Sequence, residues 1–393
     1  MLPRIDALRN LGGCTFRQGM GYNRVMGKSE HSRRDFLQGK AAMRTLVSSA
    51  REIVEPWVDA VEMLLPSDSP ADSTIHIQAS RRAMACEFAV KYHALDHRDD
   101  LFLAAFELIE EIESLLTVYQ PRSAVIEINQ SAAKGPVVVN AELFSLIELS
   151  QRLFYDTAGA FDITSTPLSR VWGFFKRAGH LPSESEIADA LEHVDGQQIE
   201  LNLTERSVRF LRPGIEINFN SIGKGHALDR VAQRLEEQGA SDYLWHGGSS
   251  SVLARGSDRS GDRSGWTIGL RHPLQPELRV AEIRLQDRAL GTSGGATQFF
   301  EREGRHYGHV LDPRTGWPAS GVFAATAIAP SAAEADALAT AFYVLGPEGS
   351  ARYCAERPDV GAVLVTPAPG KEEIEVHAFN LGPEDWTPAS EVR

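Results

Sequence analysis

The sequence is poor in the features that mark disulfide-rich, zinc-binding and membrane-spanning proteins. Its 393 residues include three cysteines, Cys14, Cys86 and Cys354, which lie far apart and form no Cys-x-x-Cys pair. This spacing excludes a disulfide framework and a thiolate metal site, so any metal would be a hard cation on oxygen ligands. No apolar run approaches the roughly 18 residues that a membrane-spanning helix needs, and we expect no transmembrane span.

Positive charge is also scarce. Lys and Arg number 40 against 53 Asp and Glu, which gives a formal net charge of −13. A chain of this charge is poorly suited to non-specific binding of nucleic acid or to docking on anionic lipid, so neither is an expected partner. The hydrophobic fraction of 42% and the charged fraction of 24% are ordinary for a soluble globular protein.

Two short patterns near the start resemble export signals. Residues 32–40, SRRDFLQGK, resemble a twin-arginine signal, and residues 11–14, LGGC, resemble a lipoprotein cleavage site. Both signals require an adjacent apolar segment, but the residues after Lys40 are interrupted by Arg44 and those before Cys14 are largely polar. We therefore favour a cytoplasmic location, with export to the cell envelope through the twin-arginine-like segment as the alternative.

Composition divides the chain into three parts. Residues 1–70 are a polar extension, residues 71–366 have a globular composition, and residues 367–393 are an acidic, proline-containing tail. Apolar periodicity predicts helices over residues 99–119, 140–160, 224–240 and 332–346, and strands over residues 73–90, 249–256 and 265–273, the last two paired with each other. Helices and strands do not alternate regularly, which favours an α+β fold of layered mixed or antiparallel sheets with packed helices.

The predicted helix over residues 332–346 carries a polar pair. Asp336 and Thr340 stand four residues apart and share one face, while apolar residues occupy another. A carboxylate and a hydroxyl at this spacing could give two oxygens to Mg²⁺. The same spacing is common on solvated helix faces, and the pair alone favours that second interpretation. Ser331 and Glu334 predict a capping box at the start of the helix.

Residues 218–229, NFNSIGKGHALD, lead into another predicted helix through two glycines and Lys224. Backbone N–H groups at a helix N-terminus, with a lysine beside them, form a site suited to phosphates. The segment is not a P-loop, because Gly225 stands where that motif requires Ser or Thr. A helix start in which glycine allows close packing explains the segment equally well, and both interpretations stay open.

Three further segments combine turn residues with polar side chains. Residues 159–174 place Asp162 and Thr164 before a proline, as an Asx-type turn would. Residues 289–300, ALGTSGGATQFF, predict a glycine-rich turn where backbone could approach a ligand. Residues 306–318, HYGHVLDPRTGWP, hold two histidines, an aspartate and an arginine beside prolines that disfavour helix, which predicts a rigid turn.

The order of these segments and their amino-acid sequences resemble those of the FAD:protein FMN transferase family, the ApbE-type flavin transferases. The matching blocks are MACEFAV, ESLLTVYQPRSAVIEIN, GAFDITSTPLSRVWGF, NSIGKGHALDRVAQRL, IGLRHP, TSGGATQFF, YGHVLDPRTGWP and ADALATAFYVLG, and they cover roughly residues 74–350. The resemblance implies the ApbE-type fold and a Mg²⁺-dependent enzyme. Such an enzyme binds FAD, splits its pyrophosphate, transfers FMN to a Ser or Thr of an acceptor protein, and releases AMP.

The resemblance also implies roles for particular residues. His309 would be the base that takes the proton of the acceptor hydroxyl, held rigid by the prolines and Asp312. An imidazole suits that role because it titrates near neutral pH. The remaining implied residues would contact FAD or surround the metal. The FAD contacts are Met84, Tyr119, Ala160, Phe161, Asp162, Asn218 and Lys224, and the metal would be surrounded by Ser221, Asp336 and Thr340.

This sequence departs from the family pattern in three places. Asn218 stands where the family usually has Asp, and Gly247-Gly248-Ser249 stands where the family usually reads Gly-Gly-Asp. Gly295, Ala296 and Thr297 replace an Asp-Tyr pair and charged residues. Two alternatives to the transferase therefore remain, namely a FAD-binding protein without transfer activity and a FAD pyrophosphatase that yields FMN and AMP.

Overall fold

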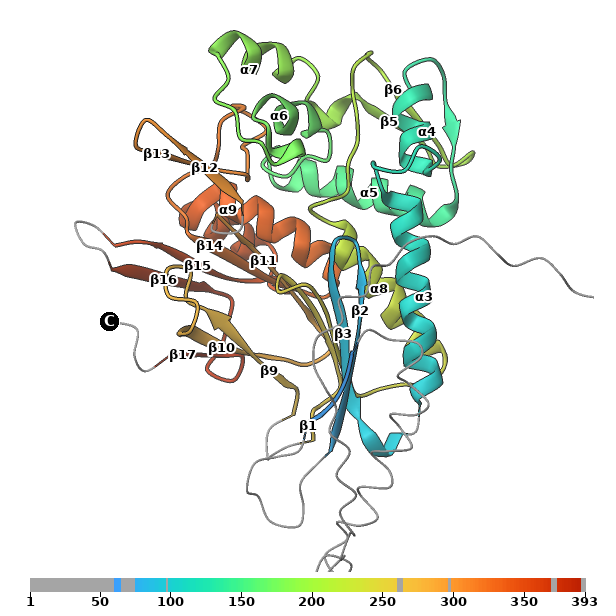
Figure 1. Ribbon diagram of the computed structural model, residues 1–393, viewed down its shortest axis with the longest axis vertical. Helices are drawn as coiled ribbons and strands as arrows, with labels where there is room; N and C mark the ends of the chain where they lie inside the picture. The colour runs from blue at the N-terminus through green and yellow to red at the C-terminus, as the bar shows by residue number, and fades with distance from the viewer. Residues whose placement is uncertain are drawn as a thin grey trace, which may run out of the picture. The chain divides into compact units, whose positions relative to one another are not determined.

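The computed structural model describes residues 60–64, 75–96, 98–259, 264–295, 298–368 and 373–389, and of residues 60–64 the backbone alone (Figure 1). The two export-like patterns, residues 11–14 and 32–40, lie outside these ranges, as do Ala296 and Thr297. No helix in the described part of the chain is both long and apolar enough to cross a bilayer.

A nine-stranded sheet organises the fold. Its strand order is β1-β2-β3-β7-β8-β11-β14-β15-β16, and every pairing is antiparallel. The strands are β1 (Ala60–Leu64), β2 (His76–Ala83), β3 (Cys86–His93), β7 (Tyr243–Gly247), β8 (Ser251–Arg255), β11 (Ala289–Gly294), β14 (Ala324–Ala329), β15 (Gly361–Pro367) and β16 (Ile374–Phe379). The predicted strand region over residues 73–90 is confirmed as the β2–β3 hairpin.

Helices cover one face of this sheet (Figure 1). The helices in contact with the sheet are α3 (Asp99–Leu116), α8 (Gly223–Glu237) and α9 (Ala332–Glu356). Of the other two long helices, α4 (Ala124–Ser131) packs on α3 and α5 (Ala141–Asp156) packs on α9. All four predicted helices are confirmed, because their apolar residues recur on the face that enters the core. The helix predicted over residues 332–346 stops being regular at Gly346, whose φ is 67°, and Pro347 follows inside the same element.

The N-terminus of α9 is capped by two side chains. The Ser331 hydroxyl accepts a hydrogen bond from the Glu334 N–H at 3.2 Å, as predicted. The Glu334 carboxylate does not complete the capping box, because it pairs with the Arg357 guanidinium at 3.0 Å. Asp229 of α8 supplies the second cap and accepts the N–H groups of Ala332 and Ala333 at 2.7 and 2.8 Å.

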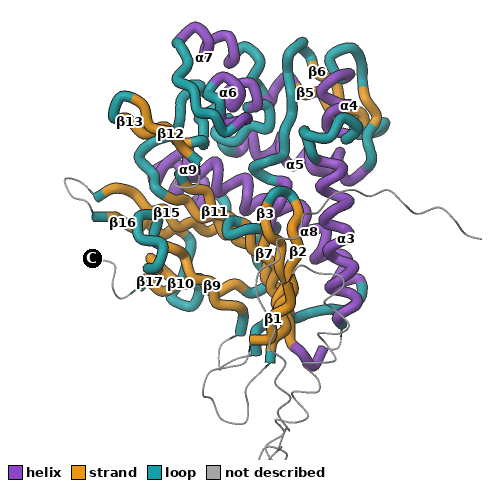
Figure 2. Tube along the Cα trace, viewed as in Figure 1, coloured by secondary structure: helices purple, strands orange, loops and turns teal. Residues whose placement is uncertain are grey.

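The other face of the large sheet carries a three-stranded sheet, of order β17-β10-β9 (Figure 2). Its strands are β9 (Trp266–Arg271), β10 (Arg279–Leu285) and β17 (Trp386–Pro388). The predicted pairing of residues 249–256 with residues 265–273 is therefore wrong, since β8 belongs to the large sheet and β9 to the small one. Gly256 and Gly265 have φ values of 58° and 98°, which turn the chain out of one sheet and into the other.

Strands of the fold occur beyond both predicted boundaries, at residues 70 and 366. β1 begins at Ala60 and pairs with β2, so the sheet starts inside the expected extension. In the expected tail, β16 pairs with β15 and β17 pairs with β10. Val376 and Trp386 pack against the core between the two sheets, which binds this polar segment to the domain.

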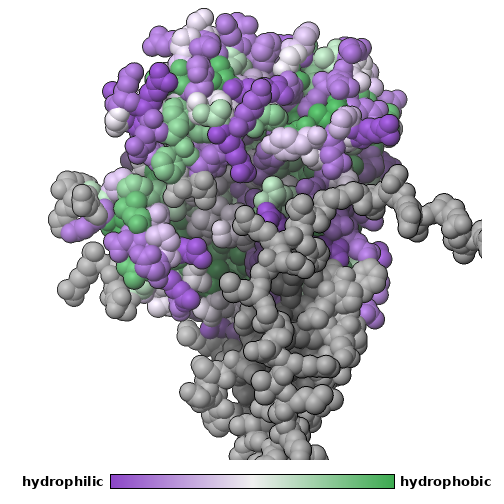
Figure 3. All heavy atoms as spheres, in the orientation of Figure 1, coloured by the Kyte–Doolittle hydropathy of each residue, from purple (hydrophilic) through white to green (hydrophobic). Residues whose placement is uncertain are grey.

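The remaining elements sit above the sheet and near its helices (Figure 1). They are α6 (Thr166–Val171), η2 (Phe174–Lys176), α7 (Glu184–Leu191), η3 (Gly196–Gln198), a sheet of β4 (Val137–Val138), β5 (Ile199–Asn202) and β6 (Ser207–Phe210), and the hairpin of β12 (Phe299–Arg302) and β13 (Arg305–Gly308). The short helix η1 (Ala94–Asp96) instead lies between β3 and α3 along the chain. A small core of Leu168, Trp172, Phe174, Ile187 and Leu311 holds α6 and α7. On the described surface facing the viewer in Figure 3, apolar residues occur in separate patches.

Candidate active site

Asp336 lies where α8, α9 and β8 meet. Its side chain is almost wholly buried, with 6% of the residue exposed. Oδ2 accepts the Gly225 N–H at 2.7 Å, and Oδ1 accepts the Ser251 hydroxyl at 2.6 Å. The Lys224 ammonium stands 4.0 Å from Oδ2. Three elements distant in sequence therefore converge on one carboxylate.

Burial raises the pKa of Asp336, and the charge of Lys224 and the hydrogen bonds from Ser251 and Gly225 offset only part of that effect. A further cation would stabilise the ionised form of a buried carboxylate whose charge is only partly offset. An ionised carboxylate has about four lone-pair positions, and two of them are used by Ser251 and Gly225. The donor chemistry of Asp336 therefore fits a hard cation such as Mg²⁺.

Hydroxyl groups line the same junction. Thr340 lies one turn after Asp336, and its Oγ1 is 3.1 Å from the Ser293 Oγ on β11. The Thr340 hydroxyl also donates weakly to the Asp336 carbonyl, at 3.4 Å. Ser221 is half-buried and stands two residues before α8 begins. In the described ranges no group of three or more His, Cys, Asp or Glu could hold a metal, so a cation here would depend on hydroxyl, phosphate or water oxygens.

Gly225 is required by the packing of α8 against α9. A Cβ at this position would lie 2.0 Å from the Ala332 carbonyl oxygen, far inside van der Waals contact. The close-packing interpretation of the glycine is therefore confirmed. The N–H groups of Ile222, Gly223 and Gly225 are already bonded within the protein. The Lys224 ammonium, with its side chain 23% exposed, is the group at this helix end that can reach an anion.

Asp162 organises the turn that follows α5. Its Oδ1 accepts the Thr164 N–H and hydroxyl at 2.8 and 2.7 Å, and its Oδ2 accepts the Gly196 N–H at 3.0 Å. The predicted Asx-type turn is thus confirmed. Burial raises the pKa of Asp162 to about 6, against the lowering effect of these hydrogen bonds. Ala160 and Phe161 are each 1% exposed, so only their backbone could meet a ligand.

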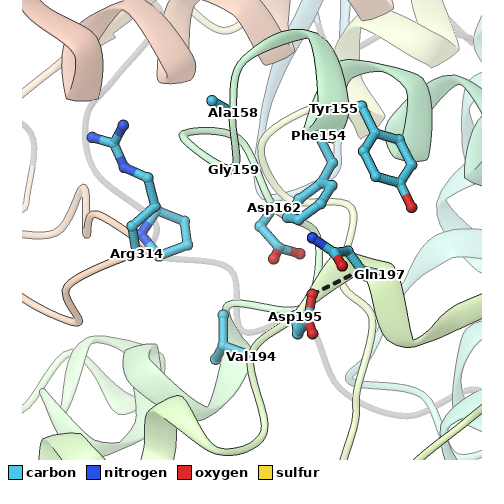
Figure 4. A pocket seen from close by; sticks show the side chains of 10 residues that line it. Phe154, Tyr155, Ala158, Gly159, Asp162, Val194, Asp195, Gln197 and Arg314 are labelled. Carbon is cyan, nitrogen blue, oxygen red and sulfur yellow. Dashed lines mark hydrogen bonds between the residues drawn. The ribbon is translucent and has the colours of Figure 1, made fainter.

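A cavity of about 340 Å³ opens beside Asp162 (Figure 4). Its wall combines residues that follow α5 with the turn at residues 313–314 and the segment around η3. In Figure 4, Asp195 and Gln197, which are hydrogen-bonded to each other, lie on one side of the cavity, and Arg314 lies on the other side. A cavity of this size lies within the usual range for small-molecule sites, roughly 300–1,000 Å³.

Asn218 lies next to the Asp162 turn. Its N–H donates to the Ile163 carbonyl at 2.9 Å, which brings two of the expected FAD-contacting segments together. The Asn218 side chain accepts the Asn220 N–H at 2.8 Å, so one of its polar atoms already has a partner.

His309 is oriented by a main-chain carbonyl. Its Nδ1–H donates to the Gln298 oxygen at 3.1 Å, and its backbone N–H donates to the same oxygen at 3.1 Å. This bond leaves Nε2 as the unprotonated nitrogen, able to accept a proton. Burial lowers the pKa of His309, and the Gln298 bond partly offsets that effect, so the neutral ring predominates at neutral pH.

Asp312 supports the turn that follows His309. Asp312 pairs in a bidentate manner with Arg314, at 2.8 Å for each contact, and its backbone closes the turn through Trp317, Thr315 and Gly316. Asp312 thus holds the turn together, and Gln298 orients the histidine.

The structure places Met84 and Tyr119 at two exposed turns. Met84 and Ala85 form the two-residue turn of the β2–β3 hairpin, with φ values of 48° and 60°. Tyr119 follows α3, is 65% exposed, and stacks obliquely on Phe175 with 5.5 Å between the ring centroids.

Two serines that contact Asp336 and Thr340, Ser251 and Ser293, were not identified from the sequence. Ser251 and Ser293 were part of segments predicted as a strand and as a glycine-rich turn. The latter prediction is wrong for residues 289–294, which form β11, and Gly291 is needed there because a Cβ would lie 2.4 Å from the Ala335 carbonyl oxygen. The pairing of β8 with β11 brings both serines to α9.

A lysine, a buried carboxylate and hydroxyl groups gathered at a helix start are the side chains that suit a class of protein, the enzymes that act on phosphate-containing substrates. The chain belongs to the ApbE family, whose model matches residues 73–364.

Curated relatives and solved structures agree with this family. A protein of Klebsiella pneumoniae (strain 342) is 29% identical over 273 residues, 69% of this chain and 83% of its own length. A protein of Escherichia coli (strain K12) is 31% identical over 261 residues, 65% of this chain and 73% of its own. Both are named FAD:protein FMN transferase.

Two crystal structures share the fold. The ApbE protein of Thermotoga maritima superposes with a TM-score of 0.69 at 27% identity, over 77% of this chain and 97% of its own. The flavinyl transferase ApbE of Pseudomonas stutzeri, in its apo form, superposes with a TM-score of 0.68 at 27% identity, over 77% of this chain and 94% of its own. The predicted α+β fold with antiparallel sheets and packed helices is thereby confirmed.

Proposed function

We propose that this protein is a Mg²⁺-dependent FAD:protein FMN transferase, which attaches FMN from FAD to a Ser or Thr of an acceptor protein. The observation that carries the proposal is the Asp336–Lys224 pair at 4.0 Å, set within a chain that matches the ApbE family over residues 73–364. The naming of its relatives as FAD:protein FMN transferases supports the same activity.

The reaction exchanges one phosphorus–oxygen bond for another. The acceptor hydroxyl oxygen forms a bond to the phosphorus of the FMN half of FAD, and the pyrophosphate bond to the AMP half breaks. AMP leaves with the bridging oxygen. His309 takes the hydroxyl proton on Nε2, which the Gln298 carbonyl leaves free by binding Nδ1–H.

Mg²⁺ would be held by Asp336, with Thr340 and Ser221 as neutral oxygen contacts. Asp336 fits the role because it is buried, only partly neutralised and still has lone pairs to offer. When bound, the cation would neutralise charge on the pyrophosphate. Lys224 binds the same phosphates through its exposed ammonium, which holds the donor in place.

The remaining FAD contacts are assigned to Met84, Tyr119, Asp162 and Asn218, and to the backbone of Ala160 and Phe161. The contact between the Asn218 N–H and the Ile163 carbonyl supports a shared surface for the last four. Asn218 stands where the family usually has Asp, and it brings no negative charge to this surface. We expect weaker Mg²⁺ binding than with a carboxylate at this position.

The test is to incubate the full chain with FAD, Mg²⁺ and a candidate acceptor protein, and to measure intact masses and free nucleotides. Covalent FMN on the acceptor together with AMP supports the proposal. FMN and AMP with an unmodified acceptor would show a pyrophosphatase. Intact FAD bound to the protein, with neither product, would show a flavin-binding protein without transfer. An acceptor variant lacking its Ser and Thr hydroxyls at the modified site is the matched control.

A further inference from the structure

Two adjacent phenylalanines of η2 have different surroundings. Phe174 is 7% exposed and packs in the small core with Trp172, its ring 5.7 Å from that of Phe300. Phe175 is half-buried, and its ring lies 5.5 Å from the exposed ring of Tyr119 at an interplanar angle of 32°. Phe174 therefore anchors the turn, and Phe175 faces the Tyr119 loop.

The backbone of η2 holds this arrangement. Gly173 and Arg177, on either side of the turn, have φ values of 73° and 53°. A Cβ on Gly173 would lie 3.0 Å from the backbone of Gly179 and His180, so the chain passes itself closely here. The Gln298 side chain donates to the Phe174 carbonyl at 3.0 Å, and the Gln298 carbonyl is the group that orients His309. One turn thus contacts both the Tyr119 ring and the support of the proposed base.

A cation backs the Phe175 ring. The Arg170 guanidinium carbon lies 5.2 Å from the ring centroid, and Nη1 pairs with Glu216 at 2.6 Å. Glu216 stands two residues before Asn218, another assigned FAD contact. Arg170, Phe175 and Tyr119 form a stack that extends from the Asn218 segment to the loop after α3. We call these three residues the aromatic stack.

The end of the aromatic stack is open to solvent. Tyr119 is 65% exposed, and its ring meets the Phe175 ring on one side at an angle of 32°. An exposed aromatic ring that is supported on one side is suited to bind a planar ring on the other, because offset stacking adds to the gain from burial. FAD carries two planar rings, isoalloxazine and adenine.

We propose that Phe175, backed by Arg170, is a positioning residue that holds the Tyr119 ring for stacking with one of the planar rings of FAD. The proposal rests on the proposed function, which makes FAD the donor substrate. It adds a residue outside the FAD and metal contacts assigned above, and it predicts an effect on FAD binding that passes through Tyr119.

The experiment measures FAD affinity of the full chain by calorimetry for wild type, Phe175→Leu, Phe175→Tyr, Tyr119→Leu and the double variant Tyr119→Leu/Phe175→Leu. Phe175→Leu is expected to weaken binding about three- to tenfold, and Phe175→Tyr to restore it. In the Tyr119→Leu background, Phe175→Leu should have little further effect, because coupled residues are not additive. In kinetics, KM for FAD should rise while the rate at saturating FAD changes less than about twofold.

Phe299→Leu is the matched control, since Phe299 is an exposed phenylalanine of β12 whose ring stacks on His306, with 4.2 Å between the ring centroids. It should leave FAD affinity unchanged. If Phe175→Leu fails to fold, Arg170→Met provides the second variant and should weaken FAD binding in the same direction.

Affinities for ADP and for FMN show which ring binds. Weaker ADP binding in Phe175→Leu assigns adenine, and weaker FMN binding assigns isoalloxazine; unchanged binding of both overturns the proposal. Additive effects in the double variant, or a lower melting temperature with unchanged FAD affinity, would also overturn it. Failure of the proposed function is distinguishable, because wild type would then bind FAD yet modify no acceptor.

Discussion

At the scale of single residues, the chemistry depends on which atoms of His309 and Asp336 already have partners. The Gln298 carbonyl occupies Nδ1 of His309 and leaves Nε2 free, whereas Asp336 shares each carboxylate oxygen with one donor. Burial lowers the pKa of the first group and raises that of the second, since desolvation disfavours the charged form of both.

His309→Asn should reduce FMN transfer about 10²- to 10⁴-fold and leave FAD binding nearly unchanged, because a base acts on the acceptor proton. The rate of wild type should fall on the acid side, as protonation of His309 removes the base. Because burial lowers the pKa of His309, this fall should lie below pH 6.5, the ordinary value. A pH–rate profile of kcat/KM for the acceptor checks both statements.

His306→Asn is the control for that measurement, since His306 is exposed on β13. If His309→Asn transferred FMN at the wild-type rate and His306→Asn did not, His306 would be the base instead.

Asp336→Ala should abolish Mg²⁺-dependent turnover, while Thr340→Ala should raise the Mg²⁺ concentration required. The carboxylate would supply the charge and the hydroxyl a neutral contact. Titration of the transfer rate with Mg²⁺ checks this, with melting temperatures recorded because Asp336 also accepts two hydrogen bonds of the fold. Unchanged Mg²⁺ dependence in Asp336→Ala would show that the metal does not bind at α9.

At the scale of elements, the site depends on how closely α8 and α9 approach each other. Gly225 allows the contact, and Asp229 fixes it by accepting two N–H groups of the first turn of α9. The same approach brings Lys224 of α8 to Asp336 of α9. A carboxylate at a helix N-terminus also interacts favourably with the helix dipole.

Asp229→Asn should destabilise the protein by about 1–3 kcal/mol at pH 7, because an amide can accept only one of the two buried N–H groups cleanly. Urea unfolding monitored by circular dichroism measures the change. Asp189→Asn, an exposed position on α7, is the control and should stay within about 0.5 kcal/mol. An equal effect of the two substitutions would mean that Asp229 does not stabilise the helix pair.

At the scale of the whole molecule, the described residues between Ala60 and Ala389 belong to one compact unit. The last two strands belong to this unit, because β16 pairs with β15 of the large sheet and β17 pairs with β10 of the small one. The Asn380 side chain adds hydrogen bonds to the carbonyls of Cys354 and Val360 at 2.5 and 2.9 Å, which ties the segment to the end of α9.

A chain that ends at Pro367 should lose about 5 °C of melting temperature. It would lose the contacts of Val376 and Trp386, which are partly buried and worth about 1.5–2 kcal/mol each, and in a unit of this length each kcal/mol shifts the midpoint by about 1–2 °C. Thermal unfolding followed by circular dichroism tests this against a chain that ends at Ala389. Equal midpoints would show that residues 368–389 are dispensable, as their composition suggests.

The sequence by itself was sufficient for features that depend on nearby residues. The apolar spacing of residues 99–119 and 140–160 predicted α3 and α5, and the Asp162–Thr164 spacing predicted an Asx-type turn, because each signal lies within a few residues. The polar pair Asp336 and Thr340 could be placed on one helix face for the same reason.

The contacts that those residues make with distant parts of the chain were decided only by the tertiary structure. Asp336 accepts hydrogen bonds from Ser251 and Gly225, which lie 85 and 111 residues away in the sequence, and no local sequence pattern encodes such partners. Strands β8 and β9 both read as strands in the sequence, but β8 is buried on both faces and β9 mainly on one, and their separation into two sheets was decided by which faces could be buried together. The polar composition of residues 367–393 suggested a tail, yet an edge strand such as β16 needs few apolar side chains, because its backbone pairs on one side and faces solvent on the other.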